Sequence, residues 1–121
     1  MIEGQFSSKG ELFFEIDLVA SDGLAITVDA LLDTGFTDWL AINTADAESF
    51  GWQLVDNQET RITAQGEAQF NIYDGTVNLA GEEFNIPVIA GDGIAEVLMG
   101  LPWLFTRRLV VDFPVETLTL G

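Results

Sequence analysis

Apolar and polar residues alternate along much of the chain, and this two-residue period predicts β-strands with one buried face. One such stretch runs from Glu11 to Ala20, with apolar side chains at its even positions, and a second runs from Leu24 to Leu32. Ser21-Asp22-Gly23 lies between them and is a typical turn sequence. The sequence therefore predicts an antiparallel hairpin whose apolar face, including Leu24 and Ile26, lies in a core.

The rest of the chain continues this pattern with short interruptions. Further strands are expected at residues 39–42, 59–64, 67–79, 84–90, 97–99, 109–113 and 118–120. A brief helix is expected over 45–50, capped by Asn43 or Thr44, and Pro102 suits a second short helix through about Phe105. The apolar phase slips at Asp74-Gly75, which indicates a bulge or bend there. The fold class expected is all-β, with one or two short helices.

Length and charge narrow the function. The chain has 121 residues, of which 48% are hydrophobic, so residues 1–121 are expected to form a single domain. Its formal net charge is −16. A surface this acidic repels phosphate backbones and anionic lipids, which argues against nucleic acid or a membrane as partner. Positively charged peptides would be attracted.

The chain contains neither Cys nor His. Cys-His and Ser-His dyads, thiol redox chemistry and histidine-containing zinc sites are therefore excluded, and carboxylates remain as the catalytic groups. No cofactor or metal is expected. Residues 1–5 lack the basic and apolar regions of a signal peptide, and no apolar run reaches the roughly 20 residues that span a bilayer. We expect a cytoplasmic protein.

Asp33 is the candidate for catalysis. It follows the apolar strand that ends at Leu32 and precedes Thr34-Gly35, where glycine permits a sharp turn. The simpler interpretation is an ordinary turn at the end of a strand, for which these residues are common. Hydrolysis of a peptide without a covalent intermediate needs one group to activate water and another to donate a proton. One Asp33 supplies half of that requirement.

Four segments together carry a resemblance to a known family. They are Leu31-Leu32-Asp33-Thr34-Gly35, the hairpin expected around Gly66, the apolar segment Val97 to Leu104 with Gly100 inside it, and Val110-Val111-Asp112-Phe113. In their order and spacing they resemble the retropepsin-like aspartic proteases, single-domain relatives of pepsin that build one active site from two copies. The resemblance implies a pepsin/retropepsin-like acid protease barrel and a homodimer.

The same resemblance implies the activity and the catalytic residues. The chain would be an aspartic endopeptidase, in which a water activated by the paired Asp33 carboxylates of two subunits hydrolyses a peptide or protein substrate. Thr34 would tie the two Asp-Thr-Gly loops together, and Gly35 would lend backbone groups to the carboxylate or the substrate. Gln65 and Gly66 would form the tip of a flap that closes over the substrate.

Phe36 and Leu101 are implied as further substrate-binding residues, and both depart from the family pattern. Phe36 stands where relatives usually carry Ala or Ser, which would narrow the site. Leu101 stands where viral members carry an Arg that pairs with an Asp, and the matching position for that Asp is Thr37. The usual ion pair that supports the dimer is therefore missing. An ion pair of Arg107 or Arg108 with Asp38 could replace the missing one. The alternative role of these arginines is to place positive charge at the end of the second helix.

Two alternatives remain open. A retropepsin-like domain that binds peptides or associates with itself, without cutting, also fits the altered positions. An acidic β-barrel that binds a metal ion through Asp22, Asp92 and Glu96 is the other alternative, although no loop has the pattern of an EF-hand. Because two copies would carry twice the charge of one, we expect both dimerisation and activity to be favoured at acidic pH.

Overall fold

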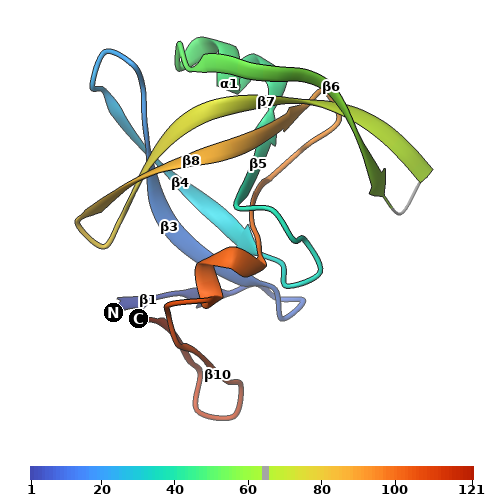
Figure 1. Ribbon diagram of the computed structural model, residues 1–121. Coiled ribbons are helices and arrows are strands. Elements are labelled where there is room, and N and C mark those ends of the chain that lie inside the picture. The colour runs from blue at the N-terminus through green and yellow to red at the C-terminus, as the bar shows by residue number, and fades with distance from the viewer. Residues whose placement is uncertain (64–65) are drawn as a thin grey trace.

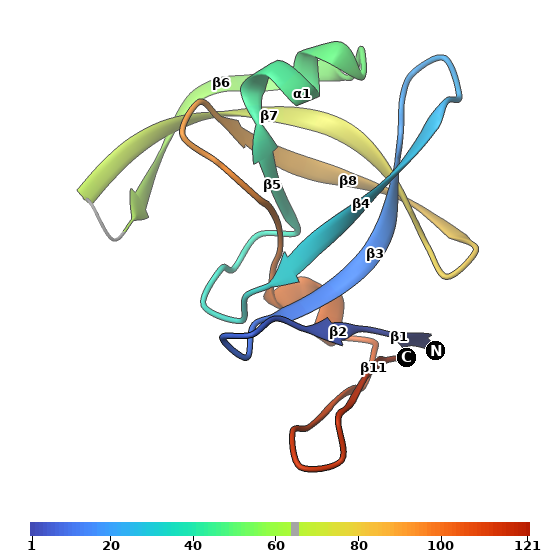
Figure 2. The same cartoon turned by 180° about the vertical axis from the view of Figure 1, so that it is seen from behind.

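The computed structural model describes residues 1–63 and 66–121, and Figures 1 and 2 show it from opposite sides. The strands are β1 (Ile2–Glu3), β2 (Gln5–Phe6), β3 (Leu12–Val19), β4 (Ala25–Leu32), β5 (Leu40–Asn43), β6 (Gln53–Thr63), β7 (Gly66–Leu79), β8 (Glu82–Gly91), β9 (Val97–Met99), β10 (Leu109–Asp112) and β11 (Thr117–Leu120). The helical elements are α1 (Thr44–Ser49) and the 3-10 helix η1 (Leu101–Leu104). The predicted all-β class with one or two short helices is confirmed.

Most strands belong to one sheet, in which a strand near one edge also pairs with a strand near the other. Eight strands follow the order β2-β3-β4-β9-β5-β8-β7-β6, and β7 also pairs with β3 through Thr76 to Asn78. β3 and β4 form the predicted antiparallel hairpin. Because β7 is long and curved, it reaches from the top of the molecule back to β3 (Figure 1). The sheet thereby curves around the core.

Strand β9 lies between β4 and β5, although β4 and β5 follow each other in the sequence. It pairs parallel to β4, with Leu32 opposite Met99, and antiparallel to β5, with Leu40 opposite Met99. The loop that joins β4 to β5, residues 33–39, therefore leaves one side of β9 and returns on the other. This arrangement places Asp33 beside the end of β9.

The two ends of the chain form a second, smaller sheet. Its order is β1-β11-β10, so the last strand lies between the first strand and its own hairpin partner. The termini lie side by side, and the hairpin of β10 and β11 projects from the bottom of the molecule (Figure 1). No helix among the described residues is long and apolar enough to cross a membrane.

The core depends on packing around Trp103, whose side chain is 1% exposed. Its ring meets the rings of Trp39 and Phe84 edge-on, with centroids 5.1 and 5.2 Å apart. Its indole Nε1 donates a hydrogen bond of 2.7 Å to the carbonyl oxygen of Trp39. The buried polar atom is thus satisfied, and η1 is fixed against the loop between β4 and β5.

Two local predictions about strands were wrong in part. Ala30 and Leu32 are buried, but Leu24 and Ile26 are 61% and 43% exposed, because Leu24 and the start of β4 extend beyond the core. At Asp74-Gly75 the pairing of β7 with β8 continues without a shift, and the irregular register lies in β6 instead, between Leu54 and Glu59.

The helix predictions held in one place and failed in another. Asn43 caps α1 by accepting a hydrogen bond of 2.8 Å from the backbone N–H of Ala45, as expected. The second helix is the 3-10 helix η1, and its last turn contains no basic residue. Arg107 lies beyond it and pairs with Glu82 at 3.2 Å. The proposed closing role of the arginines is therefore not observed.

Replacing Trp103 with Phe should lower the free energy of unfolding by about 1 to 3 kcal/mol, because a buried hydrogen bond to the Trp39 carbonyl is lost. Urea denaturation followed by circular dichroism measures this change. Trp52→Phe is a parallel test that should show a similar loss, since its indole donates a similar bond of 2.8 Å to the Val19 carbonyl elsewhere in the core. Unchanged stability in Trp103→Phe would contradict the assigned role of this bond.

Candidate active site

Asp33 lies directly after β4, where its carboxylate is exposed and held in one orientation. Its backbone N–H donates to the carbonyl oxygen of Met99 at 2.9 Å, which continues the pairing of β4 with β9 by one residue. Its Oδ1 accepts a hydrogen bond of 2.9 Å from the backbone N–H of Gly35. The N–H of Phe36 donates to the Asp33 carbonyl at 3.1 Å, which closes the turn. The carboxylate is therefore oriented by the backbone of its own loop.

Gly100 fixes the other side of this loop. A Cβ added to Gly100 would lie 1.7 Å from the carbonyl oxygen of Asp38 and 2.7 Å from that of Phe36, so only glycine allows the approach. Gly100 N–H donates to the Trp39 carbonyl at 3.1 Å, and Leu101 N–H donates to the Phe36 carbonyl at 2.8 Å. The segment after β9 thus holds the loop of Asp33 through backbone hydrogen bonds from Gly100 and Leu101, in addition to the indole hydrogen bond of Trp103.

An apolar cavity of about 270 Å³ opens beside the Asp33 loop. Its apolar lining consists of Phe36, Ala41, Phe70, Ile89, Ile94 and Leu98. Gly35, Thr37, Asp38 and Arg61 complete the lining. The volume and the lining suit an apolar side chain of a ligand.

The hairpin of β6 and β7 projects beyond the other strands at the right of Figure 1, on the same side as the Asp33 loop. Thr63 pairs with Gly66 at its end, and Arg61 pairs with Ala68 two residue pairs further along the ladder. Gly66 is exposed, with a φ of 108° that favours glycine. Gln65 lies outside the described residues. Arg61 and Phe70 of this hairpin line the apolar cavity, so the hairpin forms one of its walls.

An ion pair joins the hairpin to the Asp33 loop. Arg61 Nε lies 3.3 Å from Asp38 Oδ2, and Arg61 Nη1 lies 3.2 Å from Glu59 Oε1. Partial burial opposes the charge of Arg61, but its hydrogen bonds to Glu59 and Asp38 raise its pKa above the usual value. The Arg61 and Asp38 side chains are 33% and 36% exposed, so the pair contributes only about 0.2 to 1 kcal/mol to folding.

This pairing corrects one expectation from the sequence. Within the chain, Asp38 pairs with Arg61 and not with Arg107 or Arg108. Arg107 is held elsewhere, by Glu82 and by the face of the Phe84 ring at 5.2 Å. Arg61 is one of four basic residues in the chain and adjoins the predicted flap tip. Its rarity was the one sequence signal that could have identified it.

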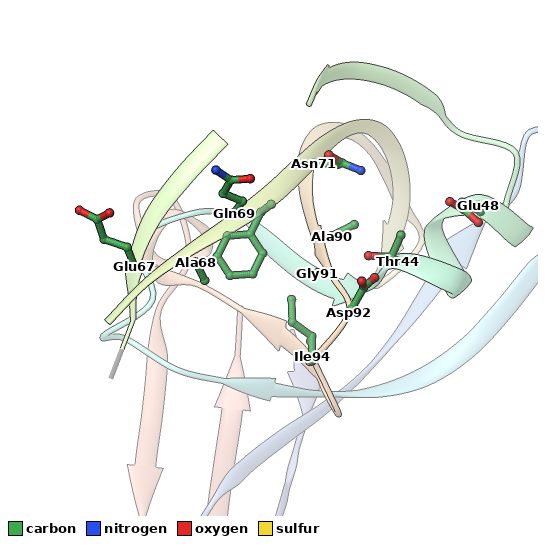
Figure 3. Close-up of a pocket in the computed structure, with 12 residues that line it drawn as sticks. Thr44, Glu48, Glu67, Ala68, Gln69, Asn71, Ala90, Gly91, Asp92 and Ile94 are labelled. Atoms are coloured by element: carbon green, nitrogen blue, oxygen red, sulfur yellow. The ribbon is translucent and has the colours of Figure 1, made fainter. Parts of the chain in front are cut away.

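A larger and more polar groove, of about 800 Å³, lies beyond the apolar cavity and shares Phe70 and Ile94 with it. Figure 3 shows Glu67 and Gln69 of β7 at one end of this groove and Thr44 and Glu48 of α1 at the other. The groove has no residue of the Asp33 loop in its lining. The smaller cavity is therefore the better candidate for the part of a substrate nearest Asp33.

The metal-binding alternative finds no support in the described part of the chain. Asp22 lies in the turn between β3 and β4, where its Oδ1 accepts a hydrogen bond of 3.0 Å from Leu24 N–H. Asp92 and Glu96 lie after β8. Within residues 1–63 and 66–121, no group of three or more acidic residues is arranged to hold a metal ion.

Comparison with solved structures identifies the fold. A retropepsin-like aspartic protease from Rickettsia conorii superposes with a TM-score of 0.67 at 22% identity, covering 98% of this chain and 88% of that one. The chain has the retropepsin-like fold. The protease of EIAV in complex with the inhibitor HBY-793 gives a TM-score of 0.67 at 14% identity, over 88% of this chain and 99% of that one. The retroviral protease-like domain of Ddi1 from Leishmania major gives a TM-score of 0.53 at 21% identity, over 90% of this chain and 88% of that one.

No family model and no curated protein matches the sequence. The comparisons therefore establish the retropepsin-like fold, and the residue roles stay predictions. Asp33, Thr34 and Gly35 share one exposed turn, and Phe36 lies in the cavity wall. Leu101 is half-buried and is not part of the cavity lining, and its backbone N–H donates to the Phe36 carbonyl in the loop. Sequence reasoning missed the lining residues on β5 to β9 and in the loop after β8, because they are distant from Asp33 in the chain.

Gly100→Ala should lower the free energy of unfolding by at least about 3 kcal/mol or prevent folding, because its Cβ would overlap the Asp38 carbonyl. Chemical denaturation measures the change. Gly93→Ala is the control: an added Cβ there meets nothing within 4 Å, and its stability should stay within about 0.5 kcal/mol of the wild type. Equal stability of the two variants would show that the close approach is not essential.

Proposed function

We propose that two copies of this chain assemble into an aspartic endopeptidase, with one Asp33 from each copy in a shared active site. The observation that carries the proposal is the exposed Asp33 carboxylate, oriented by Gly35 N–H beside an apolar cavity with a projecting hairpin as one wall. A single oriented carboxylate in each copy, with room for a peptide side chain next to it, suits hydrolysis of a peptide bond by a pair of carboxylates. The retropepsin-like fold supports the same assignment.

The chemistry of the proposal follows from placing two carboxylates close together. Like charges a few ångströms apart cannot both ionise at low cost, so the two Asp33 side chains hold one proton between them. The ionised Asp33 accepts a proton from a water molecule, whose oxygen bonds to the scissile carbonyl carbon. The protonated Asp33 donates its proton to the carbonyl oxygen at the same time.

The second half of the reaction breaks the peptide bond. The Asp33 that accepted the water proton now donates it to the amide nitrogen, which makes that nitrogen a good leaving group. The other Asp33 removes a proton from a hydroxyl of the tetrahedral intermediate, the carbonyl forms again and the bond between carbon and nitrogen breaks. One peptide bond and one water molecule become a carboxyl group and an amine, and the pair again holds one proton.

The second candidate function is peptide binding without cleavage. It is favoured by Phe36, whose ring occupies the cavity wall where relatives usually carry a smaller residue. In both functions the partners are a peptide or protein segment and a second copy of the chain. We propose a cytoplasmic location, because a chain without Cys agrees with a reducing compartment.

Asp33→Asn should abolish cleavage of an unfolded protein or peptide library, because an amide cannot act as the base, while the fold and the dimer remain. Mass spectrometry of the products, with and without pepstatin, measures cleavage. Asp29→Asn is the control, an exposed carboxylate on the same strand that lies opposite Glu15 and outside the Asp33 loop. Cleavage that survives in Asp33→Asn would overturn the enzyme proposal, and wild-type protein that binds peptides as a dimer without cutting would favour the binding module.

The dimer should become tighter at acidic pH and at higher salt. Each copy carries a formal charge of −16, and protonation of carboxylates reduces the repulsion between copies. Salt screens the same repulsion, since the Debye length falls from about 10 Å at 0.1 M to about 3 Å at 1 M. Sedimentation at two pH values and two salt concentrations measures the association. Dimers that weaken as pH falls from neutral to mildly acidic values, with the fold intact, would contradict this prediction.

A further inference from the structure

Arg61 and Asp38 are the charged residues in the lining of the apolar cavity within the described part of the chain. They come from different elements, because Arg61 lies on β6 and Asp38 lies in the loop that carries Asp33. Arg61 Nε and Asp38 Oδ2 are 3.3 Å apart and form an ion pair in the cavity lining. The remaining lining is apolar apart from Thr37 and the backbone of Gly35.

We propose that Arg61 is a specificity-determining residue. By pairing with Asp38 it closes the charged end of this cavity. The cavity therefore accepts uncharged apolar side chains of a peptide and rejects lysine, arginine, aspartate and glutamate. The inference rests on the proposed function only in taking the cavity as a subsite for peptide side chains. It adds which residue sets the charge selectivity of that subsite.

The rejection of basic side chains follows from the partners of Asp38. In a protein with a net charge of −16, an unpaired carboxylate in a cavity would attract lysine or arginine. Arg61 already satisfies Asp38, and its own positive charge repels a second cation. Binding of a peptide also removes water from the cavity, which strengthens this repulsion.

The rejection of acidic side chains follows from the partners of Arg61. Its Nε faces Asp38, and its Nη1 faces Glu59 Oε1 at 3.2 Å and the Thr60 carbonyl at 3.4 Å. Two carboxylates thus already neutralise the guanidinium, so an incoming aspartate or glutamate would meet two like charges. An apolar side chain can fill the space without disturbing the pair.

The same ion pair links the projecting hairpin to the Asp33 loop within one subunit. A charged peptide side chain that separates Arg61 from Asp38 would also break this link. Such a peptide would then bind while the hairpin is less firmly attached to the Asp33 loop. The ion pair therefore couples the selectivity of the cavity to the position of its wall.

The test measures peptide affinity in the Asp33→Asn background, so that binding is observed without cleavage. Labelled peptides carry Leu, Lys or Glu at each position in turn around the peptide bond that the wild-type protein cuts. If the wild-type protein cuts no peptide, the same replacements are made along the library peptide that binds most tightly. Fluorescence anisotropy gives the affinity of each. Arg61→Gln should reduce the penalty for Lys against Leu by about tenfold at one position only, because Asp38 is then unpaired. Asp38→Asn should leave that Lys penalty in place and reduce the penalty for Glu at the same position.

Two variants serve as controls. Arg107→Gln removes an arginine with a similar ion pair far from the cavity, at 3.2 Å from Glu82, and should leave all penalties unchanged. Arg61→Lys keeps the charge and should keep the wild-type penalty for Lys, which separates a charge effect from a folding defect. Unchanged ratios in both Arg61→Gln and Asp38→Asn, or equal shifts in Arg107→Gln, would overturn the proposal.

Failure of this inference is distinguishable from failure of the proposed function. If the wild type does not cleave but the Lys and Glu penalties shift as expected, the cavity selects by charge in a binding module. If the wild type cleaves and the penalties do not shift, the endopeptidase stands and Arg61 does not determine its specificity.

Discussion

The close approach of Gly100 to the loop between β4 and β5 is the constraint on which the candidate active site depends. There is no space for a side chain between Gly100 and the carbonyl oxygens of Asp38 and Phe36, so the two backbones meet directly. This contact allows Gly100 and Leu101 to donate hydrogen bonds to Trp39 and Phe36. The loop that carries Asp33 is consequently held in part by backbone groups, whose positions do not depend on side-chain rotamers.

The same constraint explains why the apolar cavity lies beside Asp33. The insertion of β9 between β4 and β5 turns Leu98 of β9 toward Phe36 and Ala41, and β8 contributes Ile89 from the next strand in the sheet. The buried indole of Trp103 then fixes η1 behind the loop. A rigid floor is thus combined with a projecting hairpin, attached to it through the exposed pair of Arg61 and Asp38. That combination is compatible with the peptide-binding site that we propose.

The sequence predicted the features that have local signals. The hairpin of β3 and β4, the Asn43 cap and the turn at Asp33 each follow from neighbouring residues, and the family resemblance supplied the order of the elements. The insertion of β9, the pairing of β1 with β11 and the contact of Arg61 with Asp38 join residues far apart in the chain, for which alternation carries no information. Regular alternation can also predict burial wrongly. Leu24 and Ile26 follow the apolar pattern, but the core does not extend to them.

The central claim is that one active site needs an Asp33 from each of two copies, and mixing of subunits tests it most directly. Wild-type and Asp33→Asn chains would be unfolded together, refolded in varying proportions at constant total concentration, and assayed for peptide cleavage. If both carboxylates are required, mixed dimers are inactive and the activity falls as the square of the wild-type fraction. A linear fall would mean that each chain cuts with its own Asp33 and would contradict the shared site.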